Sequence, residues 1–471
     1  MINISFSLMQ IYTFATEKSN KFKMSEDIRL KKGLNIPMLG EAEQVYSTTE
    51  ESKRYELKPT DFHGITPKLA VKVGDKVKSG SVVFFDKYNE KIKFCSPVSG
   101  EIKEIVRGEK RRILKVVISS DNDKSFETFS VSDNLSREQI IDTMCSSGVW
   151  PFIRQKPYDV IANPADMPKS IFISSFNSAP ISIDNDFALY GKSDLFQYGL
   201  NIVTKLTKGT THLNIDGYSN PSNVFTFSKG VQINKISGDH PSGNVGVQIH
   251  HIDPINKDDI IWYLTPQDVL TIATLFKDGK YDASRIIAVA GSQISRPKYY
   301  RTISGTTVSN FLKDNLKEGN TRIISGDVLT GSKIHKDGSL GFYDYQITAI
   351  EEGDESEFLG WITPGLNKFS ASRTFLSWLI PTKKYSLDAN LHGEERAYVM
   401  TGEYEKVLPM DVYPTHLIKA IMIEDIELME NLGIYEVSPE DFALCEFVCT
   451  SKIEVQKIIR YGLDLVRKEN S

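Results

Sequence analysis

The sequence predicts a multi-domain protein that contains both α and β structure, α/β in its middle part and α+β as a whole. A β-rich part is followed by a part in which strands and helices alternate, and the chain ends in a helical part. Short β-branched runs separated by glycine turns fill residues 57–120. Strand-like and helix-like patterns alternate over residues 150–295, which favours a layer of parallel strands and helices. From Pro381 the pattern is helical again. The length of 471 residues fits about three domains.

Four short runs in the β-rich part are expected to be strands, because they are rich in β-branched residues and bounded by turn signals such as Val73-Gly74-Asp75 and Ser99-Gly100. These runs are Leu69–Val73, Ser81–Phe85, Ile92–Cys95 and Leu114–Ile118.

Lys91 lies close to the position at which lipoyl and biotinyl carrier domains hold their modified lysine. The surrounding stretch, VKVGDKVKSGSVVFFD followed by SPVSGEIKEI, resembles those domains. However, the local sequence NEKIKF has neither the Met-Lys-Met nor the Asp-Lys-Ala pattern. A solvated hairpin lysine is the favoured interpretation, and an attached cofactor at Lys91 is the alternative.

The alternating part contains the clearest helix signal of the chain. Thr265 is suited to the N-cap, Pro266 to the first turn and Asp268 to the positive end of the helix dipole, and Gly279 ends the pattern. The other elements expected here are strands at Ile171–Phe176, His212–Ile215 and Ile286–Ala290 and a helix at Leu195–Leu206.

Residues 299–350 are predicted to form a small β-rich unit with one helix, Thr306–Leu316. Further along, Ser438-Pro439-Glu440-Asp441 is a helix start of the capping-box type, with Asp in place of the usual Glu. Lys452–Lys468 has the pattern of an amphipathic helix.

Composition excludes several classes of protein. The formal charge is −5, from 56 basic and 61 acidic side chains, and nucleic-acid binding calls for a basic surplus instead. Four cysteines are too few for a disulfide framework in a chain of this length. No stretch approaches 18 consecutive apolar residues, so no membrane-spanning helix is expected.

The residues alone predict neither a catalytic set nor a metal site. The nucleotide-binding patterns G-x-G-x-x-G and G-x-x-x-x-G-K-[ST] are absent, and the glycine cluster of residues 237–246 is interpreted as a tight turn. His250 and His251 are adjacent, so they do not share one face and are expected to be core or interface residues. Cys445 and Cys449 lie on one helical face, but two thiolates do not complete a zinc or iron–sulfur site.

Motifs spread over nearly the whole chain from Met24 onward carry a resemblance to a known family. They include IRLKKGLNIPMLGEAEQ, VKVGDKVKSGSVVFFDKYNEKIKFCSPVSGEI, RGEKRRILKVVI, SGVWPFIRQKP, SGDHPSGNVGVQIHHIDP, GWITPGLNKFS and SPEDFALCEFVCTSK. In these stretches the chain resembles the alpha subunit of the bacterial Na+-translocating NADH:quinone reductases (Na+-NQR). Residues 1–23 lie outside the resemblance and are expected to be a non-native or disordered extension.

The resemblance implies a specific domain order, because the family is related in fold to the flavoprotein subunit of complex I and to the C subunit of the Rnf ion pump. A barrel-sandwich-like β domain is expected over residues 24–149 and a degenerate Rossmann-like α/β domain over 150–295. An SLBB domain of β-grasp type is expected over 296–380 and a helical region over 381–471.

Two departures from those relatives bear on cofactors. Their flavin loop is glycine-rich, whereas the matching Cys145–Pro151 keeps only Gly148 and adds the bulky Trp150. Their iron–sulfur segment has several cysteines, whereas only Cys445 and Cys449 stand here, which we interpret as vestigial. The resemblance therefore implies a scaffold without bound flavin, NADH or cluster, and the alternative is a flavin- or NADH-binding subunit like those relatives.

Quinone contact is expected in two segments that the resemblance identifies, Leu57–Gly64 and Trp150–Tyr158. Phe62 and Tyr158 would flank the quinone ring, and His63 and Arg154 would donate hydrogen bonds to its carbonyl oxygens. The alternative is that the aromatic side chains belong to the core and the basic ones to a solvated or interface patch. Arg285, by contrast, is expected to be a surface arginine.

The resemblance also implies partners and a location. The chain would be peripheral on the cytoplasmic face of the bacterial inner membrane, bound to subunits B to F and chiefly to B. NADH, FMN, FAD and a 2Fe-2S cluster would be held by those partners, with ubiquinone or menaquinone as the substrate. The isolated chain is not expected to be catalytic.

Overall fold

The computed structural model describes residues 26–121, 123–131, 135–354, 359–360 and 362–470. The extension expected over residues 1–23 lies outside the described residues.

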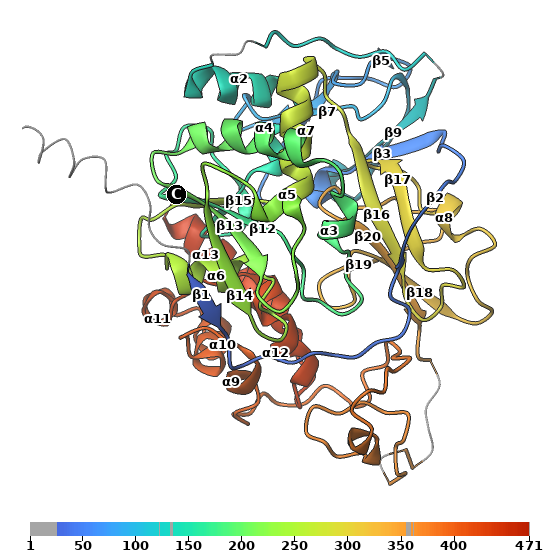
Figure 1. The fold of residues 1–471 in the computed structure, drawn as a ribbon, viewed down its shortest axis with the longest axis vertical. Helices are drawn as coiled ribbons and strands as arrows, with labels where there is room; N and C mark the ends of the chain where they lie inside the picture. Colours follow the sequence, from blue (N-terminus) through green and yellow to red (C-terminus); the bar gives the residue numbers. More distant parts are fainter. Residues whose placement is uncertain (1–25, 122, 132–134, 355–358, 361, 471) are drawn as a thin grey trace, which may run out of the picture.

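The N-terminal β unit consists of two small sheets that enclose an apolar core (Figure 1). The predicted runs Ser81–Phe85, Ile92–Cys95 and Leu114–Ile118 are confirmed as strands except at Ser81 and Ile92, whereas Leu69–Val73 is strand only at Leu69. One sheet has the order β3 (Arg54–Leu57), β9 (Ile113–Ser120), β8 (Gly100–Arg107), β5 (Lys76–Val77), and the other β4 (Pro67–Leu69), β6 (Val82–Asp86), β7 (Lys93–Cys95).

A seven-stranded sheet forms the centre of the molecule (Figure 1). Its first five strands are parallel, the sixth is antiparallel to them, and the seventh is antiparallel to the sixth. The order is β1 (Asp27–Arg29), β14 (Gln232–Ser237), β13 (Thr210–Asp216), β12 (Ser170–Ser174), β15 (Ile261–Leu264), β10 (Arg154–Lys156), β11 (Val160–Ile161). The helices between the parallel strands are α3 (Asn185–Ala188), α4 (Ser193–Val203), α5 (Asn223–Thr226) and α6 (Val245–Ile252), and α7 (Pro266–Asp278) follows β15. The predicted alternation is thereby confirmed.

Both faces of this sheet are covered, because side chains alternate along each strand. Ile171 and Ile173 of β12 pack into the same core as α4 and α7. Phe172, between them, packs into a second core with residues of α6 and of the C-terminal helices. The sheet therefore holds the helical end of the chain against its second face.

Helix α7 follows its sequence signals closely. Thr265 accepts a hydrogen bond from the Asp268 backbone, and the Asp268 side chain accepts one from the Thr265 backbone, which closes a capping box. Gly279 ends the helix in the left-handed region at φ 64°.

A six-stranded sheet of β-grasp type follows. The predicted strand Ile286–Ala290 is present, but it pairs in this sheet and not in the parallel one. The order is β19 (Ser332–Ile334), β18 (Thr321–Ser325), β20 (Gln346–Glu351), β16 (Ser284–Ala290), β17 (Lys298–Ile303), β2 (Glu43–Ser47).

The helix predicted at Thr306–Leu316 is wrong in its extent, because only α8 (Ser309–Leu312) is helical. Asp314 takes a left-handed φ of 55°, which ends the helical path. The Asn315 side chain then accepts a hydrogen bond from the backbone of Arg296 at 2.9 Å. The left-handed backbone of Asp314 and the bond between Asn315 and a residue 19 positions earlier in the chain thus replace continuation of the helix.

Five short helices form the C-terminal region, and the first begins at Tyr404. They pack around one buried apolar cluster and are drawn in red beside α6 in Figure 1. They are α9 (Tyr404–Val407), α10 (Pro414–Met422), α11 (Ile426–Asn431), α12 (Ala443–Val448) and α13 (Val455–Glu469). The last confirms the amphipathic helix predicted over Lys452–Lys468.

Two strands near the N-terminus pair far from the N-terminal β unit. β1 completes one edge of the seven-stranded sheet beside β14, and β2 completes one edge of the six-stranded sheet beside β17 (Figure 1). Within the described ranges, no helix has both the length and the apolar character needed to cross a membrane.

Candidate functional site

Phe62 lies in the core of the N-terminal β unit. It follows the 3-10 helix η2 (Pro59–Asp61), and its side chain is 3% exposed. Its ring centroid lies 4.4 Å from that of Phe94 and 4.7 Å from that of Phe342. Phe62 is therefore packed between the β unit and the β-grasp unit.

His63 points away from this core toward helix α13. Its Nε2 lies 2.7 Å from the Asp464 carboxylate, and both side chains remain partly exposed. The turn is held close to the helix, because a Cβ on Gly64, which has φ 76°, would come within 2.0 Å of the Arg467 guanidinium. The left-handed backbone favours glycine here, whereas the end of the Arg467 side chain could move aside for a Cβ.

Arg154, on β10, is fixed between aromatic rings. Its Nη2 donates to Asp159 at 2.6 Å, and its guanidinium carbon lies 5.1 Å from the Tyr263 ring and 4.9 Å from the Tyr343 ring. Tyr343 also contacts Phe62, at 5.8 Å between ring centroids. Two of the predicted site residues therefore share one aromatic neighbour.

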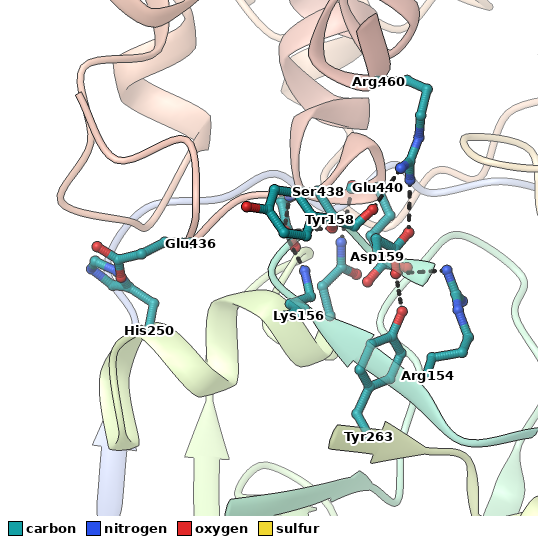
Figure 2. A network of polar contacts seen from close by, with 12 residues as sticks. Arg154, Lys156, Tyr158, Asp159, His250, Tyr263, Glu436, Ser438, Glu440 and Arg460 are labelled. Carbon is teal, nitrogen blue, oxygen red and sulfur yellow. Dashed lines mark hydrogen bonds and ion pairs between the residues drawn. The ribbon is translucent and has the colours of Figure 1, made fainter. Parts of the chain in front are cut away.

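Asp159 is the centre of a buried network (Figure 2). Its carboxylate accepts hydrogen bonds from Arg154, from the Tyr263 hydroxyl and from Arg460 of α13, the last at 3.1 Å. Burial alone would raise its pKa, but Arg154, Lys156 and Arg460 outweigh burial and lower the pKa to about 2. Asp159 is thus ionised at any physiological pH.

Tyr158 and Asp159 both have left-handed backbone angles, φ 77° and 53°. Each such residue costs of the order of 1–3 kcal/mol, so the surrounding contacts must hold this turn in place. The Tyr158 carbonyl accepts from Arg460 Nη1 at 2.7 Å, and its ring lies edge-on to Tyr435 at 6.2 Å.

The four predicted site residues are therefore brought into one neighbourhood. His63 meets α13 at Asp464 and Tyr158 meets it at Arg460, one helical turn away. Phe62 and Arg154 lie behind them, joined through Tyr343.

A second buried ion pair lies beside the first. Lys156 Nζ is 3.2 Å from Asp441, and both side chains are almost completely buried. The same Asp441 oxygen accepts from the backbone and hydroxyl of Ser438 at 3.0 and 2.7 Å, which completes the predicted capping box of the 3-10 helix η7 (Pro439–Phe442). The capping residue thus also anchors the helical region to β10.

Gly246 explains part of the glycine cluster in the sequence. A Cβ at this second residue of α6 would lie 2.3 Å from the Asp441 carboxylate and 2.6 Å from Lys156 Nζ. Absence of a side chain therefore lets the ion pair approach the helix, which is a packing role.

Glu440 is half-buried beside these pairs (Figure 2). Burial and repulsion by Asp441 and Asp159 raise its pKa to about 7, although Lys156 and Arg154 oppose the shift. Its carboxyl group can therefore gain or lose a proton near neutral pH. The charged seam, as we name it, consists of Arg154, Lys156, Asp159, Glu440, Asp441 and Arg460.

His250 and His251 point from α6 toward the C-terminal region, as expected for interface histidines. His250 Nδ1 lies 2.6 Å from Glu436, and its Nε2 accepts from the backbone of Asp411 at 2.9 Å. His251 Nε2 donates to the Pro409 carbonyl at 2.7 Å.

In the described part of the chain, no group of three or more His, Cys, Asp or Glu side chains is arranged to hold a metal ion.

The loop that matches the flavin loop is filled by the chain itself. Gly148 caps α2 (Arg137–Ser147) at φ 78°, and a Cβ there would come within 2.7 Å of Cys95. Trp150 is completely buried, donates from Nε1 to the Ala162 carbonyl at 2.7 Å and packs edge-on against Trp262.

Cys445 and Cys449 are buried in the apolar cluster of the C-terminal helices. Burial raises the pKa of Cys445 well above its ordinary value, so the thiol stays protonated. Cys449 Sγ accepts a hydrogen bond from the Tyr404 hydroxyl at 2.9 Å.

A polar cleft of about 730 Å³ lies elsewhere, between the N-terminal β unit and the β-grasp unit. It is lined by residues 50–54, Lys115, Thr307 and His335, among others, and by none of the four predicted site residues.

Lys91, also outside the neighbourhood of α13, is exposed and lies 3.7 Å from Asp142.

The expectation that Arg285 is a surface residue is wrong. Its side chain is buried and donates to the carbonyls of Phe342 and Asp344 and to the Ser304 hydroxyl. A guanidinium satisfies several such acceptors at once, which stabilises it in an interior position. The presence of an arginine in the sequence does not by itself indicate that its side chain is buried.

Sequence reasoning also misses most partners in the charged seam. Asp159 follows directly after Tyr158, and the sequence indicates Asp441 only as a cap. Arg460 sits on the polar side of an amphipathic helix, and Tyr343 lies in a loop before β20, so neither has a local signature.

Comparison with known proteins gives consistent matches along the chain. Family models match at residues 28–121 (NqrA N-terminal barrel-sandwich hybrid domain), 135–281 (NqrA second alpha/beta domain) and 286–336 (NQRA C-terminal domain). They confirm the predicted fold class of barrel-sandwich, α/β and β-grasp parts.

Three relatives each cover 94% of this chain, and each is matched over its full length. All three are the NqrA subunit of a Na(+)-translocating NADH-quinone reductase. That of Hahella chejuensis is 37% identical over 450 residues. Those of Saccharophagus degradans and Yersinia pestis are each 36% identical over 448 residues. The chain therefore belongs to the NqrA family, the alpha subunits of the Na(+)-translocating NADH-quinone reductases.

Proposed function

We propose that this chain is a peripheral subunit of a Na+-translocating NADH:quinone reductase, on the cytoplasmic face of the bacterial inner membrane. The end-to-end match with relatives of that name carries the proposal. Within the complex the chain binds the other subunits, B to F, and chiefly B.

The charged seam supports the role of a rigid scaffold. Asp159 joins β10, β15 and α13, and Lys156–Asp441 joins β10 to η7. Removal of one partner from such a buried pair leaves an unpaired charge, so arrangements that separate the α/β part from the helical part are disfavoured. A fixed arrangement suits a subunit that positions others.

In this proposal NADH, FMN, FAD and the 2Fe-2S cluster are held by partner subunits. Trp150 fills the loop that matches the flavin site, and Cys445 and Cys449 are packed among apolar side chains. Ubiquinone or menaquinone is the substrate of the whole complex, and the isolated chain has no turnover of its own.

The contribution to quinone reduction is assigned to the strip beside α13. His63 and Tyr158 are the accessible members of the predicted set, and the pair of His63 with Asp464 is itself exposed. Phe62 is only 3% exposed, and Arg154 is paired with the buried Asp159. In the proposal His63 donates to a quinone carbonyl, and this bond strengthens as negative charge builds on the oxygen. Arg154 and Phe62 act as positioning residues behind it.

Co-purification tests the assignment to the complex. The tagged chain, isolated from detergent-solubilised membranes, is expected to bring the other subunits with it, and the chain alone is expected to show no flavin absorption. A stoichiometric flavin band in the pure chain would instead favour the flavin-binding alternative.

A matched pair of histidine variants tests the quinone role. His63→Gln is expected to lower quinone reduction several-fold in the assembled complex, while electron transfer from NADH to an artificial acceptor stays normal. His392→Gln is the control, because His392 is also exposed and lies 3.0 Å from an aspartate, Asp388. Equal activities of the two variants would contradict a quinone role for this strip.

A further inference from the structure

Residues 362–384, which follow β20, expose large apolar side chains to an unusual degree. They belong to the orange part of Figure 1, which projects below β18 and away from the sheets. We call this stretch the basic apolar segment. The side chains that are 47–60% exposed are Ile362, Leu366, Leu376, Trp378, Leu379 and Ile380.

Several polar groups of this segment bond within it. Ser377 is buried, and its hydroxyl donates to the Lys368 carbonyl at 2.5 Å. Lys383 Nζ donates to the Leu366 carbonyl and to the Asn367 side chain, both at 2.6 Å. Exposed apolar side chains thus lie beside exposed polar ones such as Ser372 and Thr374.

All charged residues of the basic apolar segment are positive. It contains Lys368, Arg373, Lys383 and Lys384 and no acidic residue, in a chain whose formal charge is −5. Lys384 lies 3.0 Å from the Glu41 carboxylate, but this pair is exposed and open to competition by other anions. The short 3-10 helix η6 (Leu376–Leu379) exposes Leu376, Trp378 and Leu379, and these cations flank it in the sequence. Exposed Trp and Leu beside Lys and Arg characterise segments that lie in a membrane interface.

We propose that the basic apolar segment is a membrane-surface anchor that binds a bilayer containing anionic phospholipids. Its cations attract the phosphate headgroups, and the side chains of η6 enter the boundary between headgroups and acyl chains. The inference rests on the proposed function at the membrane surface, to which it adds the face that meets the bilayer. A protein partner fits less well, because the buried cores of protein interfaces are depleted in lysine.

Vesicle flotation with the purified full chain tests the anchor. Binding is expected to vesicles of phosphatidylglycerol and phosphatidylethanolamine in equal parts, and to weaken both in phosphatidylcholine vesicles and at high salt. Trp378→Ser combined with Leu379→Ser is expected to weaken binding at least about tenfold, because two buried apolar side chains are lost. Arg373→Gln combined with Lys384→Gln is expected to weaken it by about tenfold or more.

Two control pairs match these variants elsewhere on the surface. Tyr218→Ser with Phe227→Ser removes exposed aromatic residues that are 72% and 71% exposed. Lys205→Gln with Lys208→Gln removes two exposed cations. Both pairs are expected to bind vesicles like the unchanged chain.

Three results would overturn the anchor: no flotation of the unchanged chain with anionic vesicles, equal losses in the control pairs, or normal flotation of the Trp378/Leu379 variant. In the last case, loss of co-purification with the other subunits would assign the surface to a protein partner. An unchanged chain that floats as expected but never co-purifies would support the anchor and refute the proposed function.

Discussion

The charged seam and the basic apolar segment depart from the usual distribution of side chains in opposite directions. The seam places six ionisable side chains in buried or half-buried positions, whereas the segment exposes six large apolar ones. Most charges in the seam meet a partner from a distant part of the same chain. The apolar side chains of the segment remain largely exposed on the chain alone, so their burial requires another surface.

The two regions therefore differ in how they contribute to the free energy of folding and to the free energy of binding. Buried ion pairs are costly to desolvate and give little net stability, but loss of one partner is severely destabilising. Exposed apolar side chains leave folding almost unaffected and become favourable only on binding. Stability measurements should therefore respond strongly to changes in the seam and weakly to changes in the segment.

The largest effect is expected for Asp159→Ala. The substitution leaves Arg154 and Arg460 without their shared carboxylate, so the free energy of unfolding should fall by about 3–5 kcal/mol. Asp464→Ala is the control, because its pair with His63 is exposed, and it should cost about 1 kcal/mol or less. Urea denaturation of both variants measures the difference, and similar losses would show that the seam is no more important than a surface pair.

A smaller loss is expected when both cysteines of the helical region are replaced. Cys445→Ser with Cys449→Ser puts hydroxyls into an apolar cluster, which should cost about 1–2 kcal/mol. Assembly and turnover of the complex should stay close to normal. Complete loss of activity in a stable, assembled double variant would instead identify the thiols as ligands.

The pH dependence of stability should distinguish Glu440 from Asp159. The pKa of Glu440 is raised from 4.5 to about 7, so the folded state holds this proton more tightly than the unfolded state. Its contribution to stability is complete below pH 4.5 and is lost as the pH rises toward 7. The pKa of Asp159 is lowered to about 2, so its contribution is present above pH 3.8 and is lost as the pH falls toward 2.

Glu440→Gln removes the first of these effects. The variant should lose less stability than the unchanged chain between about pH 5 and about pH 8, by up to about 2.5 kcal/mol. Unfolding free energies at the two pH values measure this, with Glu427→Gln on the exposed side of α11 as the control. An unchanged pH profile in Glu440→Gln would contradict the raised pKa.

The smallest effect on stability is expected for Trp378→Ser. The indole is 51% exposed, so its replacement should change the free energy of unfolding by less than about 0.5 kcal/mol. A loss above about 2 kcal/mol would mean that the tryptophan supports the fold of the chain and is not reserved for an external surface.

Local signals in the sequence predict local structure well. The caps at Thr265 and Gly279 fix α7, because capping residues act within a few positions of a helix end. The same reasoning places Ser438 and Asp441 at a helix start. It cannot show that Asp441 also pairs with Lys156, 285 residues away.

Long-range features are beyond such reasoning. Neither β1 nor β2 is predicted, because each is short and has its partner strand more than 200 residues away. The four candidate site residues are neighbours, but Arg460 and Tyr343, which connect them, lie in unremarkable surroundings in sequence. The helix predicted at Thr306–Leu316 is an error of a different kind, because it is too long. The apolar periodicity of the sequence continues past residues that favour turns, so it does not show where the helix ends.

The two N-terminal strands have a consequence for synthesis of the protein. β1 and β2 leave the ribosome first, yet β14 and β17 are translated only some 200 to 250 residues later, or roughly 10 to 50 s at ordinary elongation rates. During that interval the early strands are unpaired, and unpaired strand edges favour association with other chains. The nascent chain is therefore vulnerable at its beginning until the two sheets are complete, and a chaperone that covers residues 27–47 would protect it during this interval.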